Sequence, residues 1–122
     1  MPIWFTNGGW PMWFLALVGV LCVVAAANFA YRPDLAHVPR IRALALAEAW
    51  GVVTGTAADF AAVGMNVPNR PELAHSPDLA LIVLQGFGES MSPALLGGAV
   101  LSVVALLCAA GHGRLQAQGS AP

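Results

Sequence analysis

Three long apolar segments separated by short polar links make up most of the chain. They cover residues 10–31, 43–65 and 79–110, and a polar tail follows at 112–122. A membrane-spanning helix needs about 20 apolar residues, and a helix satisfies its own backbone hydrogen bonds in lipid. We therefore expect an all-α integral membrane protein with three transmembrane helices, organised as a single membrane domain over residues 1–122.

The third segment is longer than one span requires. We expect its first turns either to leave the bilayer or to tilt, and Pro93 to kink the helix. Pro68, Pro71 and Pro77 predict a loop between the second and third segments. The polar tail is expected to fray.

The composition fits a membrane protein and excludes several function classes. Hydrophobic residues make up 58% of the 122 residues and charged residues only 9%, against about 25% charged residues in ordinary soluble domains. A net charge of −1 leaves no basic surface for nucleic acid. Because no metal-ligand spacing, catalytic triad or phosphate-binding glycine loop is present, we expect neither an enzyme nor a cofactor. Cys22 and Cys108 lie in apolar runs and are interpreted as small hydrophobic residues.

Tryptophan and arginine residues mark the ends of the segments. Tryptophan suits the headgroup level of a bilayer, and cytoplasmic loops carry an excess of Lys and Arg. The positive-inside rule places the link 32–42 and the C-terminus in the cytoplasm, with the N-terminus and the second link outside. The expected interface anchors are Trp4, Trp10, Trp13, Arg32, Arg40, Arg42 and Arg114.

Small residues recur at every fourth position of the second and third segments. This spacing puts them on one helix face, where another helix can approach closely. The small-residue face of the third segment needs a partner, and the corresponding face of the second segment can supply one. The residues expected to pack helices together are Ala47, Gly51, Gly55, Ser90, Ala94, Gly97, Gly98 and Ser102.

Two carboxyl groups lie inside the second segment. Glu48 and Asp59 are eleven positions apart, close to three helical turns, so they project from nearly the same face. Ionisable groups inside a membrane are costly and often mark ion pathways. In the alternative interpretation both are ordinary interface residues. Glu48 would then pair with Arg42 or Arg40, and Asp59 would reach water or Arg70.

Hydroxyl groups accompany these acids on the second and third segments. Membrane hydroxyls more often bond to carbonyls of their own helix than line a path. Glu89, at the start of the uncharged part of the third segment, is either a helix-end charge or a pore-lining acid. The candidate ion-path residues are Asp59, Thr54, Thr56, Glu89, Ser92 and Glu48.

Each segment carries a short motif rich in Gly or Trp. The first reads GGWPMWFLALVGVLCVVAAANFAY. A G-x-x-x-G-x-x-x-x-F pattern in the second and a G-x-x-E…G pattern in the third comprise Gly51, Gly55, Phe60, Gly86, Glu89 and Gly97. Together these motifs resemble the three membrane helices of the MotA/TolQ/ExbB proton-channel family.

The chain also departs from that family. The cytoplasmic domain that usually separates the first two helices is replaced by the link 32–42. Asn28 and Phe29 stand where the family commonly has a Glu-Arg pair, and Val52 and Ala94 stand at its hydroxyl-bearing Thr positions.

The resemblance implies a function in energy transfer across a membrane. Family members form a ring, commonly a pentamer, around the single helices of an ExbD/TolR-like partner in the bacterial inner membrane. We therefore expect a subunit of an oligomeric proton channel or motor stator, with Asp59 as a transient proton acceptor. The alternative is a non-conducting structural or accessory subunit of a larger membrane complex.

Overall fold

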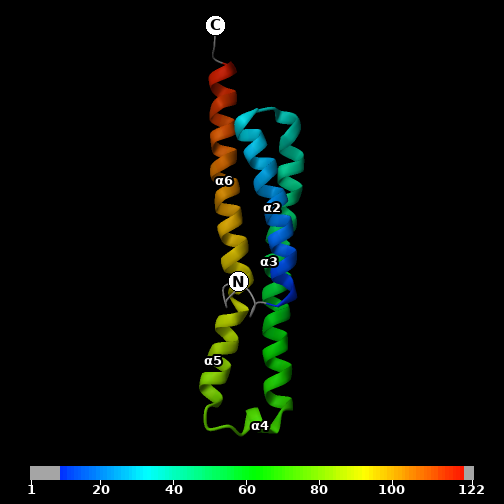
Figure 1. Cartoon of the computed structure of the whole chain (residues 1–122), viewed down its shortest axis with the longest axis vertical. Helices are drawn as coiled ribbons and strands as arrows, with labels where there is room; N and C mark the ends of the chain where they lie inside the picture. The colour runs from blue at the N-terminus through cyan, green and yellow to red at the C-terminus, as the bar shows by residue number, and fades with distance from the viewer. Residues whose placement is uncertain (1–8, 120–122) are drawn as a thin grey trace.

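The computed structural model describes residues 9–119, and every long element in that range is an α-helix. Trp4 lies outside the described residues. Figure 1 shows α3 and the α5–α6 pair as two long antiparallel columns, with the shorter α2 beside one half of them. The all-α class predicted from the sequence is confirmed. The elements are α2 (Trp10–Tyr31), the 3₁₀ turn η1 (Leu35–His37), α3 (Val38–Asn69), α4 (Pro71–Ala74), α5 (Leu79–Ser90) and α6 (Ser92–Gly119).

Helix α2 has the bounds that the sequence predicted. Pro11 lies in its first turn, where a missing N–H costs no intrahelical bond. The helix ends at Arg32, before Pro33. Arg114 Nη1 donates hydrogen bonds to the carbonyls of Ala30 (2.9 Å) and Tyr31 (3.1 Å). Two carbonyls that the helix itself leaves without partners are thereby satisfied.

Helix α3 is longer at both ends than the predicted span 43–65. It begins at Val38, inside the expected polar link, because Pro39 fits the first turn of a helix. It also continues through Pro68 in its last turn and ends at Asn69. The expected loop after it is partly helical, since α4 (Pro71–Ala74) follows at once.

The third predicted segment is divided at Met91 into α5 and α6. Pro93 has no N–H to donate to the carbonyl four residues earlier, so the helix cannot continue unbroken through this point. The polar tail is helical through Gly119 and not frayed as expected. Leu115 packs against the hydrophobic core and holds this last part of α6 in place.

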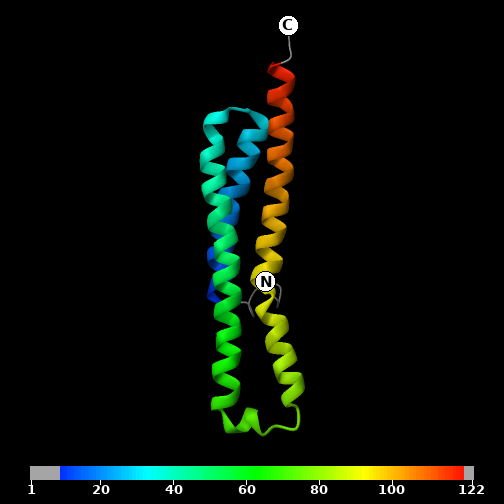
Figure 2. The ribbon, with the colours of Figure 1, turned by 180° about the vertical axis from the view of Figure 1, so that it is seen from behind.

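Three helices meet where α2 begins. A Cβ atom on Gly55 would lie 2.8 Å from Pro11 Cβ and 3.2 Å from Pro93 Cβ. On one side of this junction, α2, residues 38–55 of α3 and α6 form what we call the three-helix bundle. On the other side, residues 56–69 of α3 together with α4 and α5 form the two-helix arm. Figures 1 and 2 show the arm extending beyond the start of α2.

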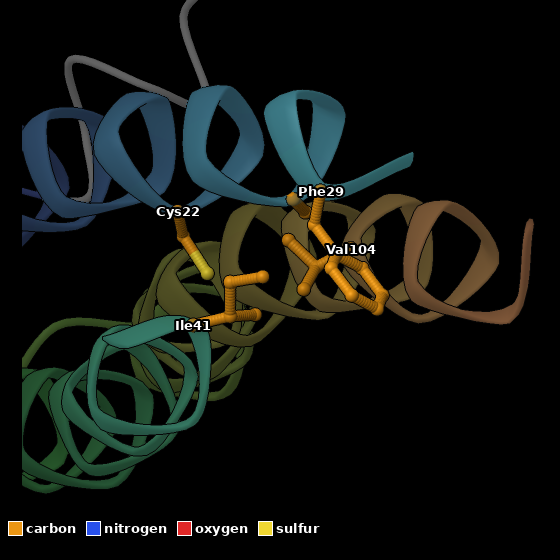
Figure 3. Close-up of a cluster of buried hydrophobic side chains, with 5 residues drawn as sticks. Cys22, Phe29, Ile41 and Val104 are labelled. Carbon is orange, nitrogen blue, oxygen red and sulfur yellow. The ribbon is translucent and has the colours of Figure 1, made fainter. Parts of the chain in front are cut away.

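The core lies in the three-helix bundle. Buried positions on α2 follow steps of three and four residues, which places them on one stripe of the helix. Cys22 and Phe29 on this stripe join Ile41 of α3 and Val104 of α6 in one buried cluster (Figure 3). The buried stripe of α2 comprises Met12, Leu15, Gly19, Cys22, Ala26 and Phe29.

Within residues 9–119, two helical stretches are long and apolar enough to cross a membrane, Trp10–Tyr31 and Leu79–Gly119. Most of each stretch is exposed: Leu17 and Val20 on α2 are 64% and 61% exposed, and Leu106 on α6 is 73% exposed. A core helix of a soluble protein would be mostly buried. The apolar surface of these stretches therefore indicates membrane association.

Candidate functional site

Glu48 lies at the centre of the three-helix bundle and is fully buried. Neither of its carboxyl oxygens has a hydrogen-bond partner among the described residues. Its Oε1 lies 3.3 Å from where a Cβ on Gly19 of α2 would stand, and 3.8 Å from the equivalent point on Gly97 of α6. The carboxyl group thus faces two glycines, one on each neighbouring helix.

The helical phase of α3 explains this burial. The buried residues of α3 are Ile41, Glu48 and Gly55, which are seven positions apart. Seven residues are close to two turns, so all three lie on the stripe that faces the other helices. A Cβ on Gly97 would overlap Val52 Cγ2, which shows how closely α3 and α6 approach beside Glu48.

The environment of Glu48 restricts its chemistry. Burying a carboxylate without a partner is costly, so this position suits a carboxyl group that holds a proton. The alternative of an interface ion pair with Arg42 or Arg40 is wrong: Glu48 is buried with no hydrogen-bonded partner among residues 9–119.

A second group of polar residues lines a pocket of about 360 Å³ between α3 and α5 in the two-helix arm. Asp59 and Glu89 line the pocket from opposite helices. Gln85 Nε2 donates a hydrogen bond to Glu89 Oε1 at 3.0 Å. Asp59 Oδ2 is buried and has no hydrogen-bond partner in the described part of the chain. The pocket also includes Asn66, so one half-enclosed space holds two carboxyl groups and two amides.

The structure separates the remaining candidate ion-path residues. Thr54 is exposed and lines an apolar groove between α2 and α3 with Trp10 and Trp50, away from Asp59. Thr56 Oγ1 is buried with no hydrogen-bond partner among residues 9–119. Ser92 is buried at the start of α6.

Two serine hydroxyls donate hydrogen bonds to backbone carbonyls four residues earlier. Ser90 Oγ donates to the carbonyl of Gly86 at 2.7 Å, and Ser102 Oγ to that of Gly98 at 2.8 Å. Ser90 lines the Asp59–Glu89 pocket, but its hydroxyl group already donates its proton to a carbonyl of its own helix.

The two small-residue faces come together only near the junction, where a Cβ on Gly55 would lie 3.2 Å from Pro93 Cβ and where Asp59 lines one pocket with Ser90. Further along α3, a Cβ on Gly51 would meet Leu15 and Phe14 of α2, so at this level the face packs on α2. On α6 the packed glycine is Gly97, whereas no atom lies within 4 Å of a Cβ on Gly98. Adjacent residues of a helix point about 100° apart around its axis. Gly97 therefore faces α3, whereas Gly98, which belongs to the regular four-residue spacing, faces outward.

The predicted interface anchors lie at the two ends of the bundle. Trp10 and Trp13 are exposed in the first turn of α2. The arginines occupy the opposite end, where Arg114 of α6 reaches the end of α2. Arg32 ends α2 there, and Arg40 and Arg42 lie in the first turns of α3.

Sequence reasoning missed Gln85 and Gly19. Gln85 precedes Glu89 by four residues, which is the spacing of neighbours on a helix surface and a usable signal. Gly19 lies on the three-and-four stripe of α2, so its place in the core was also predictable, although not its position opposite Glu48. Within residues 9–119, no three His, Cys, Asp or Glu side chains are grouped so as to hold a metal ion.

The fold and its polar groups define a class: an all-helical protein with membrane-compatible helices and carboxyl groups in its helix interfaces. No protein-family model, no curated protein and no solved structure matches the chain. The resemblance to the MotA/TolQ/ExbB family stays a prediction that rests on its motifs.

Proposed function

We propose that the protein is a three-span membrane subunit of an oligomeric proton channel or motor stator of the MotA/TolQ/ExbB type. In this proposal Glu48 is the proton-binding group within the membrane. The observation that carries it is the burial of Glu48 without a hydrogen-bond partner among the described residues, between Gly19 and Gly97. Ionisable residues inside a membrane commonly belong to ion or proton pathways.

The length of α2 supports placing the three-helix bundle in the bilayer. Its 22 residues extend over about 33 Å at 1.5 Å per residue, close to the hydrocarbon thickness of about 30 Å. Helices α3 and α6 run beside α2 and would form the second and third spans. The 32 residues of α3 extend over about 48 Å, so the two-helix arm would project from the membrane.

The distribution of arginine supports the orientation of these spans. Arg32, Arg40, Arg42 and Arg114 lie at the end of the bundle remote from the arm, whereas Arg70 lies at the far end of the arm. The positive-inside rule then places the four arginines in the cytoplasm and the arm outside. The C-terminus would be inside and the N-terminus outside.

This placement assigns different roles to the two groups of carboxyls. Asp59 and Glu89 would form the outer mouth, because their pocket lies in the arm. Glu48 is eleven residues from Asp59 along α3, or about 16 Å deeper. The hydroxyl groups of Thr56 and Ser92 would hold water between the two levels. The proton path would then run between helices of one subunit.

Exposed apolar side chains on the arm support an oligomeric assembly. Leu81 and Leu84 are each 66% exposed and Phe87 is 52% exposed. Outside the bilayer such side chains need cover from other protein, because large exposed apolar surfaces mark interaction sites. Neighbouring copies in a ring and a single-helix ExbD/TolR-like partner would provide that cover.

Proton flux into liposomes that contain the purified protein or its complex tests the proposal. Glu48→Gln should reduce flux to the level of protein-free liposomes, and Asp59→Asn should reduce it in part. Glu72→Gln is the matched control, because Glu72 lies on the exposed surface of α4. Unchanged flux in Glu48→Gln, with reconstitution verified, would contradict the assigned role.

A non-conducting structural subunit of a larger membrane complex is the second candidate. The exposed apolar residues of the arm favour it as well, since they would equally fit a different protein. Co-purification separates the candidates: a homomeric ring supports the channel, whereas one copy in a mixed complex without proton flux supports the structural role.

A further inference from the structure

A groove between α3 and α6 lies at the arginine-rich end of the three-helix bundle. It encloses about 490 Å³, within the range of about 300–1,000 Å³ that is usual for small-molecule sites. Its walls are largely apolar and include Ile41, Val104 and Ala105. Arg42 and His112 also line it. Because α3 begins at the end of the bundle where α6 ends, both polar residues lie at the same end of the groove.

This end of the groove is positively charged. Arg42 is exposed, and its guanidinium has no hydrogen bond or ion pair among residues 9–119. The His112 ring packs edge-on against Phe29, with ring centroids 5.2 Å apart and planes at 70°. No Asp or Glu side chain lines the groove. The result is an apolar groove with one unneutralised cation at its mouth.

Two neighbouring charged groups at this end, Arg114 and Asp34, have other partners. Arg114 donates to the carbonyls of Ala30 and Tyr31. The Asp34 carboxylate accepts a hydrogen bond from the backbone N–H of Ala36 at 3.0 Å. Neither interaction involves Arg42, so Arg42 remains available to an anion.

We infer that this groove binds one anionic glycerophospholipid, with its phosphate at Arg42 and an acyl chain along Ile41 and Val104. Charge and polarity identify the occupant: a single cation at the mouth complements a phosphate, and the apolar walls complement a hydrocarbon chain. Basic pockets between transmembrane helices on the cytoplasmic side bind anionic lipid headgroups. The inference rests on the membrane location and orientation given under the proposed function, and not on proton conduction.

Lipid titration of the purified, delipidated protein in detergent tests the inference. Native mass spectrometry would compare phosphatidylglycerol with phosphatidylcholine carrying the same acyl chains. Phosphatidylglycerol should be retained preferentially, and Arg42→Gln should weaken its binding about fivefold, the loss that corresponds to one cation near an anionic headgroup. Arg40→Gln is the matched control, because Arg40 lines a separate groove with Asn28 and Leu44.

A second pair of variants tests the acyl-chain part of the site without changing charge. Ala105→Phe should fill the groove and reduce retention of phosphatidylglycerol, whereas Ala109→Phe, one turn further along α6, should not. Equal retention of the two lipids, or equal losses in Arg42→Gln and Arg40→Gln, would overturn the inference. So would a dimer that is disrupted by Ala105→Phe, because a second copy would then occupy the groove.

The two proposals can fail separately. If the protein conducts no protons but still retains phosphatidylglycerol selectively, only the channel proposal is contradicted. Failure of the protein to remain with carbonate-washed phosphatidylcholine vesicles would remove the membrane location and, with it, both proposals.

Discussion

The three-helix bundle and the two-helix arm are built from the same long helix but pack very differently. Every buried residue of α3 lies in the bundle, and the last of them is Gly55. In the arm, α5 buries only Ser90, next to the junction. The arm is joined across its helices by the Phe60–Phe87 contact, with ring centroids 5.4 Å apart.

The presence of α2 in the bundle and its absence from the arm account for the difference. Where α2 is present, it packs against both α3 and α6, and Glu48 is fully buried and faces Gly19 and Gly97. Where α2 is absent, the same face of α3 borders the pocket that holds Asp59 and Glu89. Helix α3 thus carries one fully buried carboxyl group, Glu48, and another, Asp59, that lines a half-enclosed pocket.

The largest effect is expected from crowding the bundle at Gly111. A Cβ at this position would overlap the ring of Phe29, which is fully buried and cannot easily move. Gly111→Val should lower the free energy of unfolding by about 3 kcal/mol, the upper part of the usual cost of overpacking. Thermal or SDS-induced unfolding of the detergent-solubilised protein measures it.

The control for this change lies two residues away on the same helix. No atom lies within 4 Å of a Cβ on Gly113. Gly113→Val should therefore leave stability nearly unchanged. Equal losses in the two variants would show that the tight packing of the bundle does not extend to this end.

A smaller effect of opposite sign is expected at Glu48. An unsatisfied buried polar group costs about 1–3 kcal/mol, and both oxygens of Glu48 lack partners within the described chain. Glu48→Met should therefore raise the free energy of unfolding by about 2 kcal/mol while abolishing proton flux. Glu72→Met, on the exposed surface of α4, should change stability by less than about 0.5 kcal/mol. A destabilised Glu48→Met would mean that the carboxyl makes a favourable interaction in the assembly.

The smallest effect is expected in the arm. No atom lies within 4 Å of a Cβ on Gly88, so Gly88→Ala should add only the difference in helix propensity, about 0.8 kcal/mol. Hydrogen exchange of the α5 amides should slow about fourfold as a result. In Gly86→Ala the gain should be offset, because the new Cβ would lie 2.8 Å from Val63 Cγ2. Identical exchange in the two variants would indicate that α5 does not pack on α3 in solution.

The sequence predicted the class of structure and one complete helix, α2. That success has a local cause. The uncharged run has Pro11 in its first turn and Pro33 after its end, and these two prolines define where the helix begins and ends. Helix α3 was predicted too short, because the arginines near its start and Pro68 near its end were interpreted as parts of loops. Arg40, Arg42 and Asn69 are all compatible with exposed helical turns.

The burial of Glu48 could not be predicted in the same way. Most residues of α3 near Glu48 are small or apolar, so hydrophobicity alone does not reveal which face of the helix points inward. The interior face depends on glycines of other helices, Gly19 and Gly97, that are distant in sequence. The Asp59–Glu89 pocket likewise depends on how α5 folds back along α3.

The bonds from Arg114 to the end of α2 also have a consequence in time. They join residues 84 and 83 positions apart, so α2 is synthesised well before the residue that satisfies its terminal carbonyls. At 5–20 residues per second the delay is about 4–17 s. During that interval water must hydrate the carbonyls of Ala30 and Tyr31. In the proposed membrane placement, this end of α2 would stay at the membrane surface. The hydrogen bonds that satisfy the end of α2 thus form only after Arg114 of α6 has been synthesised.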